Sequence, residues 1–543
     1  MSRRETRVAR RDFLAAIGRS AGGVAMLRAM AAMGIASTVG ACGNSSASAA
    51  GAPVPPPSPP AAPPSPRPGD WPAGIGNGRS AVVIGAGIAG LVATLELGRL
   101  GYACTLLEAS GRAGGRVRTL RAGDAAVETD SVQQCLFDVH ENLYFNAGPS
   151  RIPHHHEFLL GYCREFGVAL ETFVNDNRAA WLQRPAQFGG AAQPARRIDA
   201  DTRGHVAALL STAIDRNALD AELSATDRAR VLAMLRQFGD LDVSNRYAGS
   251  QRAGFPGQEA TGSRDRGTLL PARDLEDLVA DAFWTARRTF TDGLDQQPVM
   301  LQPVGGMDRI PDALAAQVIA QLVLNAPVTE LRKTADGVRV VYESMGTAMT
   351  LEADHGVCCL PATVLSGIAN DFSAAHRSEI DGFEYAPAVR IAFQAPRFWE
   401  REHNLYGGIA WTDQDITQVW YPSHGFGDDT GILLGAYLFG GAAGEAFTNR
   451  APLQRLDDTL AQAAALHPGL PGLAARGISV AWKKVPWQLG AWGLSAPNTL
   501  LSADDRYVFA GEHLSILPAW QEGAILSAYR AIDAIVTRDS QAL

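Results

Sequence analysis

The clearest pattern of apolar and polar positions in the chain lies between Ser80 and Glu108. A continuous apolar run at 81–84 predicts a buried strand, and the glycine-rich turn GAGIAG follows it directly. A second apolar run at 104–107 ends in Glu108. Between the two runs, apolar residues recur at the 3.6-residue spacing of a helix, at Ile88, Leu91, Val92 and Leu95. The order strand, turn, helix, strand predicts a βαβ unit of a parallel sheet.

The turn has the spacing G-x-G-x-x-G, which binds a dinucleotide when a strand precedes it and a helix follows it. Gly85 permits the tight turn, Gly87 lets a pyrophosphate approach the backbone, and Gly90 lets helix and strand pack closely. The phosphates would lie against the free N–H groups at the start of the helix. Glu108, at the tip of the second strand, would accept hydrogen bonds from ribose hydroxyls and repel a 2′-phosphate. The pattern therefore predicts a dinucleotide site and argues against NADP.

Further along the chain, the pattern of apolar residues predicts first helices and then a β-sheet. The segments HEFLLGYCREFGVALETF and HVAALLSTAIDRNAL, within 156–290, have apolar residues at helical spacing, whereas 244–268 is rich in Gly, Ser and charge and predicts a loop. Long apolar runs in 385–440, such as VRIAFQAP and GILLGAYLF, predict a β-sheet. The fold class that we predict is a mixed α/β fold with a Rossmann-type domain, a β-sheet domain and a helical insertion.

Composition narrows the function. The chain has 543 residues, enough for two or three domains, and its formal net charge of −8 argues against a general nucleic-acid role. Its six cysteines form neither a C-x-x-C pair nor the dense framework of a disulfide scaffold.

The first 41 residues are predicted to be a signal peptide. Arg10 and Arg11 begin a run, RRDFL, that resembles a twin-arginine signal, and Arg19 and Arg28 interrupt the apolar stretch that follows. That stretch is a poor transmembrane helix, so we expect export to the periplasm or cell surface. The run VGAC resembles a lipoprotein cleavage box and would make Cys42 a lipid anchor; the alternative is an unrelated cysteine behind an ordinary cleavage site. Residues 42–78, rich in Ala, Pro and Ser, predict an extended linker.

After Glu108 comes the run GRAGGRVRT, which resembles the glycine- and arginine-containing segment of the flavin-dependent amine oxidases. In that family the arginine and glycines wrap the FAD pyrophosphate, so the resemblance assigns this role to Gly115 and Arg116 and favours FAD over NAD. A planar guanidinium suits phosphate oxygens. The alternative is that this run forms a surface loop in which the arginine is solvated.

A second segment, LYFNAGPSRIPHHH, resembles the L-amino-acid oxidases of this family, the bacterial L-tryptophan oxidases in particular. Arg151 matches the arginine that binds the substrate carboxylate there, and a guanidinium can form a bidentate pair with a carboxylate. A structural ion pair is the alternative. His154, His155 and His156 are adjacent, so on a helix they would diverge and could not hold one ion without distant partners. We therefore predict no metal site.

Near the C-terminus, the runs GEH and WQEGA resemble the final flavin motif of the family. The resemblance places Glu512 near the phosphate and ribose, Trp520 beside the flavin ring and the start of the last helix near the N1–C2=O edge. Val328 matches a residue whose backbone contacts the adenine. No cysteine follows Cys359, so the cysteinyl link of monoamine oxidases has no candidate and we expect non-covalent FAD.

Two further candidates lie in the predicted sheet. The run WYP resembles the place where L-amino-acid oxidases bring a tyrosine hydroxyl to the carboxylate, which makes Tyr421 a candidate; an aromatic residue of the core is the alternative. Arg390 is the best match to a lysine that holds a water near flavin N5 in many members, so either the water network differs here or the match is displaced by one residue. The aromatic residues of 482–492 suggest large apolar substrates, although core packing explains them nearly as well.

Together the resemblance implies oxidation of an L-amino acid by FAD and O2 to a 2-oxo acid, ammonia and hydrogen peroxide, in a homodimer. A decarboxylating, amide-forming monooxygenase, an amine oxidase and a non-catalytic FAD-containing lipoprotein remain alternatives. The expected catalytic residues are Arg151, Tyr421, Arg390 and Trp520. The expected FAD contacts are Gly85, Gly87, Ala89, Gly90, Glu108, Gly115, Arg116, Gly148, Pro149, Ser150, Arg151, Val328, Gly511, Glu512, Trp520, Gln521 and Ala524. The expected domains are FAD-binding (79–150, 298–370, 495–540), substrate-binding (151–180, 371–494) and helical (181–297).

Overall fold

The computed structural model describes residues 67–219, 221–255, 267–280 and 282–542. The predicted signal peptide, Cys42 and most of the predicted linker lie outside these described residues. The described chain divides into two compact units. The smaller unit comprises residues 184–293, and the larger comprises the residues up to Gln183 and from Leu294 onwards. Among the described residues, no helix combines the length and apolar character needed to cross a membrane.

A five-stranded parallel sheet forms the centre of the larger unit, in the order β11-β2-β1-β15-β22. The predicted first strand, helix and second strand are all present, so the βαβ prediction is confirmed. The bounds are β1 (Ser80–Ile84), α3 (Ile88–Arg99), β2 (Ala103–Leu107), β11 (Leu322–Val323), β15 (His355–Cys358) and β22 (Tyr507–Phe509).

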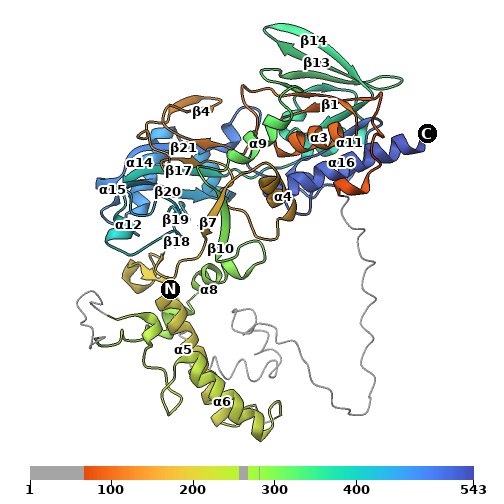
Figure 1. Ribbon diagram of the computed structural model, residues 1–543. Coiled ribbons are helices and arrows are strands. Elements are labelled where there is room, and N and C mark those ends of the chain that lie inside the picture. The colour runs from red at the N-terminus through yellow and green to blue at the C-terminus, as the bar shows by residue number, and fades with distance from the viewer. Residues whose placement is uncertain (1–66, 220, 256–266, 281, 543) are drawn as a thin grey trace, which may run out of the picture. The chain divides into compact units, whose positions relative to one another are not determined.

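Alternate residues of β1 face two different cores, because successive side chains of a strand point to opposite faces. Ala81 and Val83 pack against α3 and the last helix, α16 (Gln521–Gln541). Val82 and Ile84 pack on the other side, toward a four-stranded sheet of order β14-β13-β12-β16. Figure 1 shows β13 and β14 on one side of β1, with α3 and α16 on the other. The bounds are β12 (Val328–Lys333), β13 (Val338–Ser344), β14 (Thr347–Ala353) and β16 (Ala369–Asn370).

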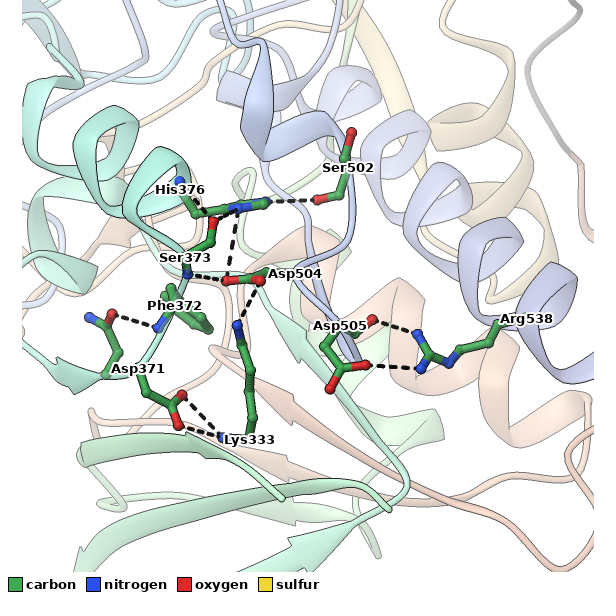
Figure 2. A network of polar contacts seen from close by, with 10 residues as sticks. Lys333, Asp371, Phe372, Ser373, His376, Ser502, Asp504, Asp505 and Arg538 are labelled. Carbon is green, nitrogen blue, oxygen red and sulfur yellow. Dashed lines mark hydrogen bonds and ion pairs between the residues drawn. The ribbon is translucent and has the colours of Figure 1, made fainter. Parts of the chain in front are cut away.

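A buried carboxylate ties three of these elements together (Figure 2). Asp504, just before β22, accepts a 2.7 Å hydrogen bond from Lys333 Nζ at the end of β12. It also accepts a 2.7 Å bond from the backbone N–H of Ser373, the residue that caps α11 (Ala374–Gly382). The network therefore holds the outer sheet and α11 against the end of the central sheet.

A second, mainly antiparallel sheet runs in the order β21-β17-β20-β19-β18-β8 within the larger unit. It confirms the β region that was predicted over 385–440. The bounds are β8 (Trp181–Gln183), β17 (Val389–Pro396), β18 (Ile409–Thr412), β19 (Gln418–Trp420), β20 (Thr430–Leu438) and β21 (Ala475–Ala481). The elements that flank it are β4 (Ala125–Glu128), β5 (Ser131–Gln134), α12 (Phe398–Arg401), α13 (Gly441–Thr448), α14 (Pro452–Ala463) and α15 (Leu470–Leu473).

One helical prediction is wrong in its second half. The segment from 156 to 173 begins as α4 (Glu157–Glu165), but Leu170–Val174 forms the strand β7. Gly167 takes a left-handed conformation, with φ of 69°, which ends the helix. The chain then pairs antiparallel with β10 (Val299–Pro303). Helical spacing of apolar residues cannot reveal a partner strand so distant in sequence.

The smaller unit is mainly helical, as the apolar spacing predicted. Its two long helices, α5 (Ala195–Asp215) and α6 (Ala225–Gly239), enclose a core that includes Ala207, Leu210 and Leu235. Two short helices follow, α7 (Leu275–Leu278) and α8 (Phe283–Arg288). In the predicted loop, the described part contains one short 3-10 turn, Gln251–Ala253.

Candidate functional site

A cavity of about 380 Å³ lies in the larger unit. It begins at the carboxyl ends of β1 and β2, passes the segment 147–151 and the start of α16, and reaches strands β17, β19 and β20. Ligands of parallel α/β sheets bind at this end of the strands. Of the residues that the sequence assigned to FAD, those that line the cavity are Gly85, Gly87, Ala89, Glu108, Gly115, Arg116, Gly148, Pro149, Ser150, Arg151, Val328, Gly511, Glu512, Trp520, Gln521 and Ala524.

Gly90 does not line the cavity. A Cβ atom at this position would lie 1.9 Å from the carbonyl oxygen of Gly85, so the residue is needed for close packing of α3 on β1. At Gly87, by contrast, an added Cβ would meet nothing within 4 Å, because this backbone faces the cavity. Gly115 approaches from another segment, and its Cβ would lie 3.4 Å from the Gly87 Cα. Gly87 and Gly115 thus bring two backbone segments without side chains close together. A bound pyrophosphate needs such close access to the backbone.

Glu108 is buried at the end of β2, where it orders the glycine-rich turn. Its Oε2 accepts a 2.8 Å hydrogen bond from the N–H of Ala86, and its Oε1 accepts bonds of 2.9 and 2.7 Å from the N–H and Oγ of Ser110. Each carboxylate oxygen has two lone pairs, so Oε2, which accepts one bond, retains an acceptor position for a ligand. The geometry fits a carboxylate that positions both the turn and a ribose.

Arg116 and Glu512 are bonded to one another across the cavity wall. Arg116 Nη1 donates to Glu512 Oε1 at 2.6 Å and to the carbonyl oxygen of Ala491 at 2.7 Å. Glu512 Oε2 accepts a 2.8 Å bond from the N–H of Ala519. The pair joins the N-terminal and C-terminal motifs and leaves both side chains in contact with the cavity.

The start of α16 presents its backbone to the cavity. Trp520 precedes the helix without a side-chain cap, and Gln521 and Ala524 line the cavity. Glu522, in the first turn, instead accepts hydrogen bonds of 3.0 and 2.8 Å from the N–H groups of Phe158 and Leu159 in α4. Burial raises the pKa of the Glu522 carboxyl. The amide groups and dipole of α16 are therefore available to an electron-rich ligand.

Arg151 lies at the other end of the cavity and is buried. Its Nη2 donates a 2.8 Å hydrogen bond to Gln296 Oε1, and its guanidinium lies 4.5 Å from the centroid of the Trp420 ring. Burial lowers the pKa of Arg151 to about 9, so the side chain is charged at neutral pH. A guanidinium in this setting can bind a carboxylate in bidentate fashion.

Arg390, on β17, is the second buried guanidinium of the cavity. Its Nη1 donates to the carbonyl oxygen of Asn146 at 2.7 Å, to Ser150 Oγ at 2.6 Å and to the carbonyl oxygen of Gly148. Its guanidinium lies 4.9 Å from the centroid of Trp420 and 4.2 Å from that of Tyr437. Burial lowers its pKa to about 10. Arg390 therefore holds the segment that leads directly into Arg151.

The interpretation of Tyr421 as a cavity residue needs correction. Its side chain is buried outside the main cavity, and its hydroxyl lies 2.6 Å from His467 Nε2. Consecutive residues of an extended segment point to opposite sides, so Trp420 faces the cavity and Tyr421 faces away from it. Tyr437 and Phe439 line the cavity from β20 and the residue after it.

Several lining residues escaped the sequence reasoning, among them the polar or aromatic residues Gln296, Tyr437 and Phe439. The spacing of Tyr437 and Phe439 gave a signal, because residues two apart in a strand share one face. Gln296 gave none, since it is far from Arg151 in the sequence. Trp482, Trp487 and Trp492 line the cavity, so the aromatic run at 482–492 contributes to its wall.

Comparisons with known proteins agree with this geometry. The profile of a family described as flavin containing amine oxidoreductase matches residues 88–536. The flavin-dependent L-tryptophan oxidase RebO of Lentzea aerocolonigenes is 28% identical over 501 residues, which cover 85% of this chain and 99% of that protein. An L-amino-acid oxidase of Notechis scutatus scutatus is 25% identical, covering 84% of this chain and 86% of the relative.

Solved structures show the same fold. Cyclohexylamine oxidase from Brevibacterium oxydans IH-35A superposes with a TM-score of 0.54 at 15% identity, covering 85% of this chain and 99% of that chain. A triple mutant of putrescine oxidase gives the same TM-score, identity and coverage.

Proposed function

Because this chain belongs to the family of flavin containing amine oxidoreductases, we propose that it is an FAD-dependent L-amino-acid oxidase. The reaction converts an L-amino acid, O2 and water to a 2-oxo acid, ammonia and hydrogen peroxide. FAD is held non-covalently by the bare backbone at Gly87 and Gly115, by Glu108 and by the Arg116–Glu512 pair. The printed names of the relatives RebO and the Notechis oxidase support an amino acid as the substrate.

The observation that carries the choice of substrate is the charge of the cavity. Arg151 and Arg390 both line its inner end. Among the described residues of the lining, the carboxylates are Glu108, which orders the glycine-rich turn, and Glu512, which is bonded to Arg116. A cationic diamine would meet two buried cations, whereas a carboxylate would be attracted to them. This argues for an amino acid over a simple amine.

The protein's contribution to the reaction is positioning. Arg151 binds the substrate carboxylate, and the Trp420 ring beside it restricts the guanidinium to one place. Arg390 fixes the segment that precedes Arg151. Aromatic side chains of Trp482, Trp492 and Tyr437 keep water from the reacting Cα. When bound, FAD would accept the hydride from Cα and pass the electrons on to O2. The amino group can lose its proton to water, so no side chain has to act as the base.

A screen of L-amino acids for peroxide release tests the proposal, with primary amines as the counter-screen. The expected result is peroxide and anaerobic bleaching of the flavin with L-amino acids, and neither with amines such as putrescine. Bleaching by amines alone would reject an amino-acid substrate. Amide formation without peroxide would identify a monooxygenase instead.

We also propose that the enzyme is exported by the twin-arginine route, is attached to a membrane through lipid on Cys42, and is a homodimer. The motif RRDFL and the box VGAC support the first two. Changing both Arg10 and Arg11 to lysine should retain the enzyme in the cytoplasm, and Cys42→Ala should release it from the membrane fraction. Light scattering of the purified enzyme tests the dimer.

A further inference from the structure

A group of metal-ligating side chains lies beside the cavity, on the segment that connects Arg151 to α4. His155 Nε2 lies 2.9 Å from Asp295 Oδ1. One ligand atom from each of His155, His156 and Asp295 lies within 4.8 Å of the other two. The sequence indicated that adjacent histidines would need a distant partner to hold an ion. Asp295 is such a partner, because the fold returns to this point at the beginning of the 294–303 segment.

His156 provides a second, independent observation. Its side chain is 1% exposed, and neither of its ring nitrogens has a hydrogen-bond partner among the described residues. The buried Nδ1 of His155 likewise lacks one among them. Buried imidazoles are ordinarily hydrogen-bonded, since leaving a buried donor or acceptor unpaired is unfavourable. A ligand that accepts the lone pair of an imidazole nitrogen would remove part of this cost.

We propose that His155, His156 and Asp295 form a binding site for a divalent transition-metal ion of the zinc type. Two imidazoles and a carboxylate are a ligand set that zinc uses, with a fourth position left for water. Calcium and magnesium prefer oxygen ligands throughout and would bind poorly. Ligand atoms around tetrahedral zinc lie about 3–3.5 Å apart, so the widest separation in the group would shorten by up to about 1.5 Å when the ion binds.

The surroundings suit a metal ligand. The side chains of His155 and Asp295 are 26% and 38% exposed, which gives an ion an entry path from solvent. With one carboxylate ligand and one divalent cation, the occupied site would carry a net positive charge.

The proposed site contacts the machinery of the cavity on two sides. Asp295 precedes Gln296, whose Oε1 accepts the hydrogen bond from Arg151. The ring of His156 packs edge-on against Trp520, with centroids 5.1 Å apart. Contraction of the ligands around an ion would therefore move Gln296 and Trp520. By linkage, an ion that changes carboxylate affinity must have its own affinity changed equally by a bound carboxylate.

The test is zinc binding to the holoenzyme, purified without a polyhistidine tag and first dialysed against chelator. Equilibrium dialysis with zinc sulfate, followed by elemental analysis, should give one tightly bound ion per chain. The variants His156→Ala and Asp295→Asn should each bind zinc at least ten-fold more weakly. His154→Ala is the matched control, because this neighbouring histidine is exposed, bonds to Gln297 and lies outside the group, so its affinity should equal that of the wild type.

Flavin absorbance and the melting temperature establish that each variant is folded. Asp295→Asn is the milder change and carries the test if His156→Ala does not fold. Equal zinc affinity in the wild type and Asp295→Asn would overturn the proposal, as would the absence of bound zinc in the wild type. Loss of binding in His154→Ala alone would also contradict it. Binding is measured without turnover, so its outcome is independent of whether the chain oxidises amino acids.

Discussion

Arg116 Nη1 lies 2.6 Å from Glu512 Oε1, and this bond joins two motifs 396 residues apart. It brings the loop after β2 next to the segment that precedes α16. The end of the cavity that is expected to bind the phosphates is therefore built from an early and a late segment of the chain. Each side chain was predicted to contact FAD separately. Their pairing means that removal of one charge leaves the other partly buried without its partner.

Glu512→Gln should weaken FAD binding by about ten- to a hundred-fold, because a hydrogen bond to a charged group contributes about 1.5–3 kcal/mol. The measurement is the ratio of flavin to protein absorbance after dialysis, together with FAD titration of the apoprotein. Asp505→Asn is the control, since Asp505 pairs with Arg538 at the surface (Figure 2). Equal flavin retention in the two variants would show that the pair does not hold the cofactor.

Arg151→Ala should raise KM for L-amino acids by about a hundred-fold, the loss expected for a charge-assisted bidentate pair. Arg151→Lys should recover only part of this, because an ammonium lacks the planar fork. Steady-state kinetics with peroxide detection give both values. An unchanged KM in Arg151→Ala, with flavin content intact, would remove Arg151 from the carboxylate site.

Two tyrosine variants separate the sequence interpretation from the structural one. Tyr437→Leu should raise KM for amino acids, since it removes the aromatic ring that packs against Arg390 and lines the cavity. Tyr421→Phe should leave KM unchanged and lower the melting temperature, because it leaves His467 Nε2 without its buried partner. Kinetics and thermal unfolding of both variants check this. The reverse pattern would restore Tyr421 as the carboxylate ligand.

Carboxylate binding should depend on pH through Arg151. Burial lowers the pKa of this guanidinium to about 9, so it is charged below this pH and loses its proton as the pH rises through it. Affinity for a carboxylate without an amino group, such as benzoate, should thus be constant near pH 7 and fall about ten-fold per pH unit above 9. Titration of the flavin spectrum measures it. Constant affinity up to pH 10.5 would contradict the shift.

A fully buried ion pair away from the cavity makes a prediction about stability. Arg455 on α14 donates bonds of 2.7 and 2.8 Å to the two carboxylate oxygens of Glu128 on β4. Arg455→Met should lower the free energy of unfolding by about 3–5 kcal/mol, because it leaves a buried charge without a partner. Adding Glu128→Met should restore part of the loss, and denaturant unfolding measures both. Additive losses in the double variant would show that the pair contributes little.

Backbone-determined features of the site were predictable from the sequence. Gly87 and Gly115 occupy positions at which a pyrophosphate needs bare backbone, and such positions are marked by the residue type itself. Side-chain orientation was less accessible: Trp420 and Tyr421 are neighbours of similar character, and only the register of β19 decides which one faces the cavity.

Contacts between distant segments were not accessible. Gln296 meets Arg151 only because β10 pairs with β7 after the chain has left and re-entered the larger unit. The same pairing replaced the predicted continuation of α4. Gly167 offered a local hint of the helix end, but the partner strand had no signature near it in the sequence.

The Trp420 indole has a guanidinium close to its ring from each of two arginines, Arg151 and Arg390. One side chain therefore couples the residue that would hold the substrate to the residue that holds the loop. Substitutions at positions 151 and 390 should have strongly non-additive effects on activity. Each one removes a guanidinium that packs on Trp420, and the remaining arginine packs on the same ring. Laboratory evolution toward new substrates would then progress through paired changes around Trp420, and single-site libraries would underestimate the range of pockets that this scaffold can reach.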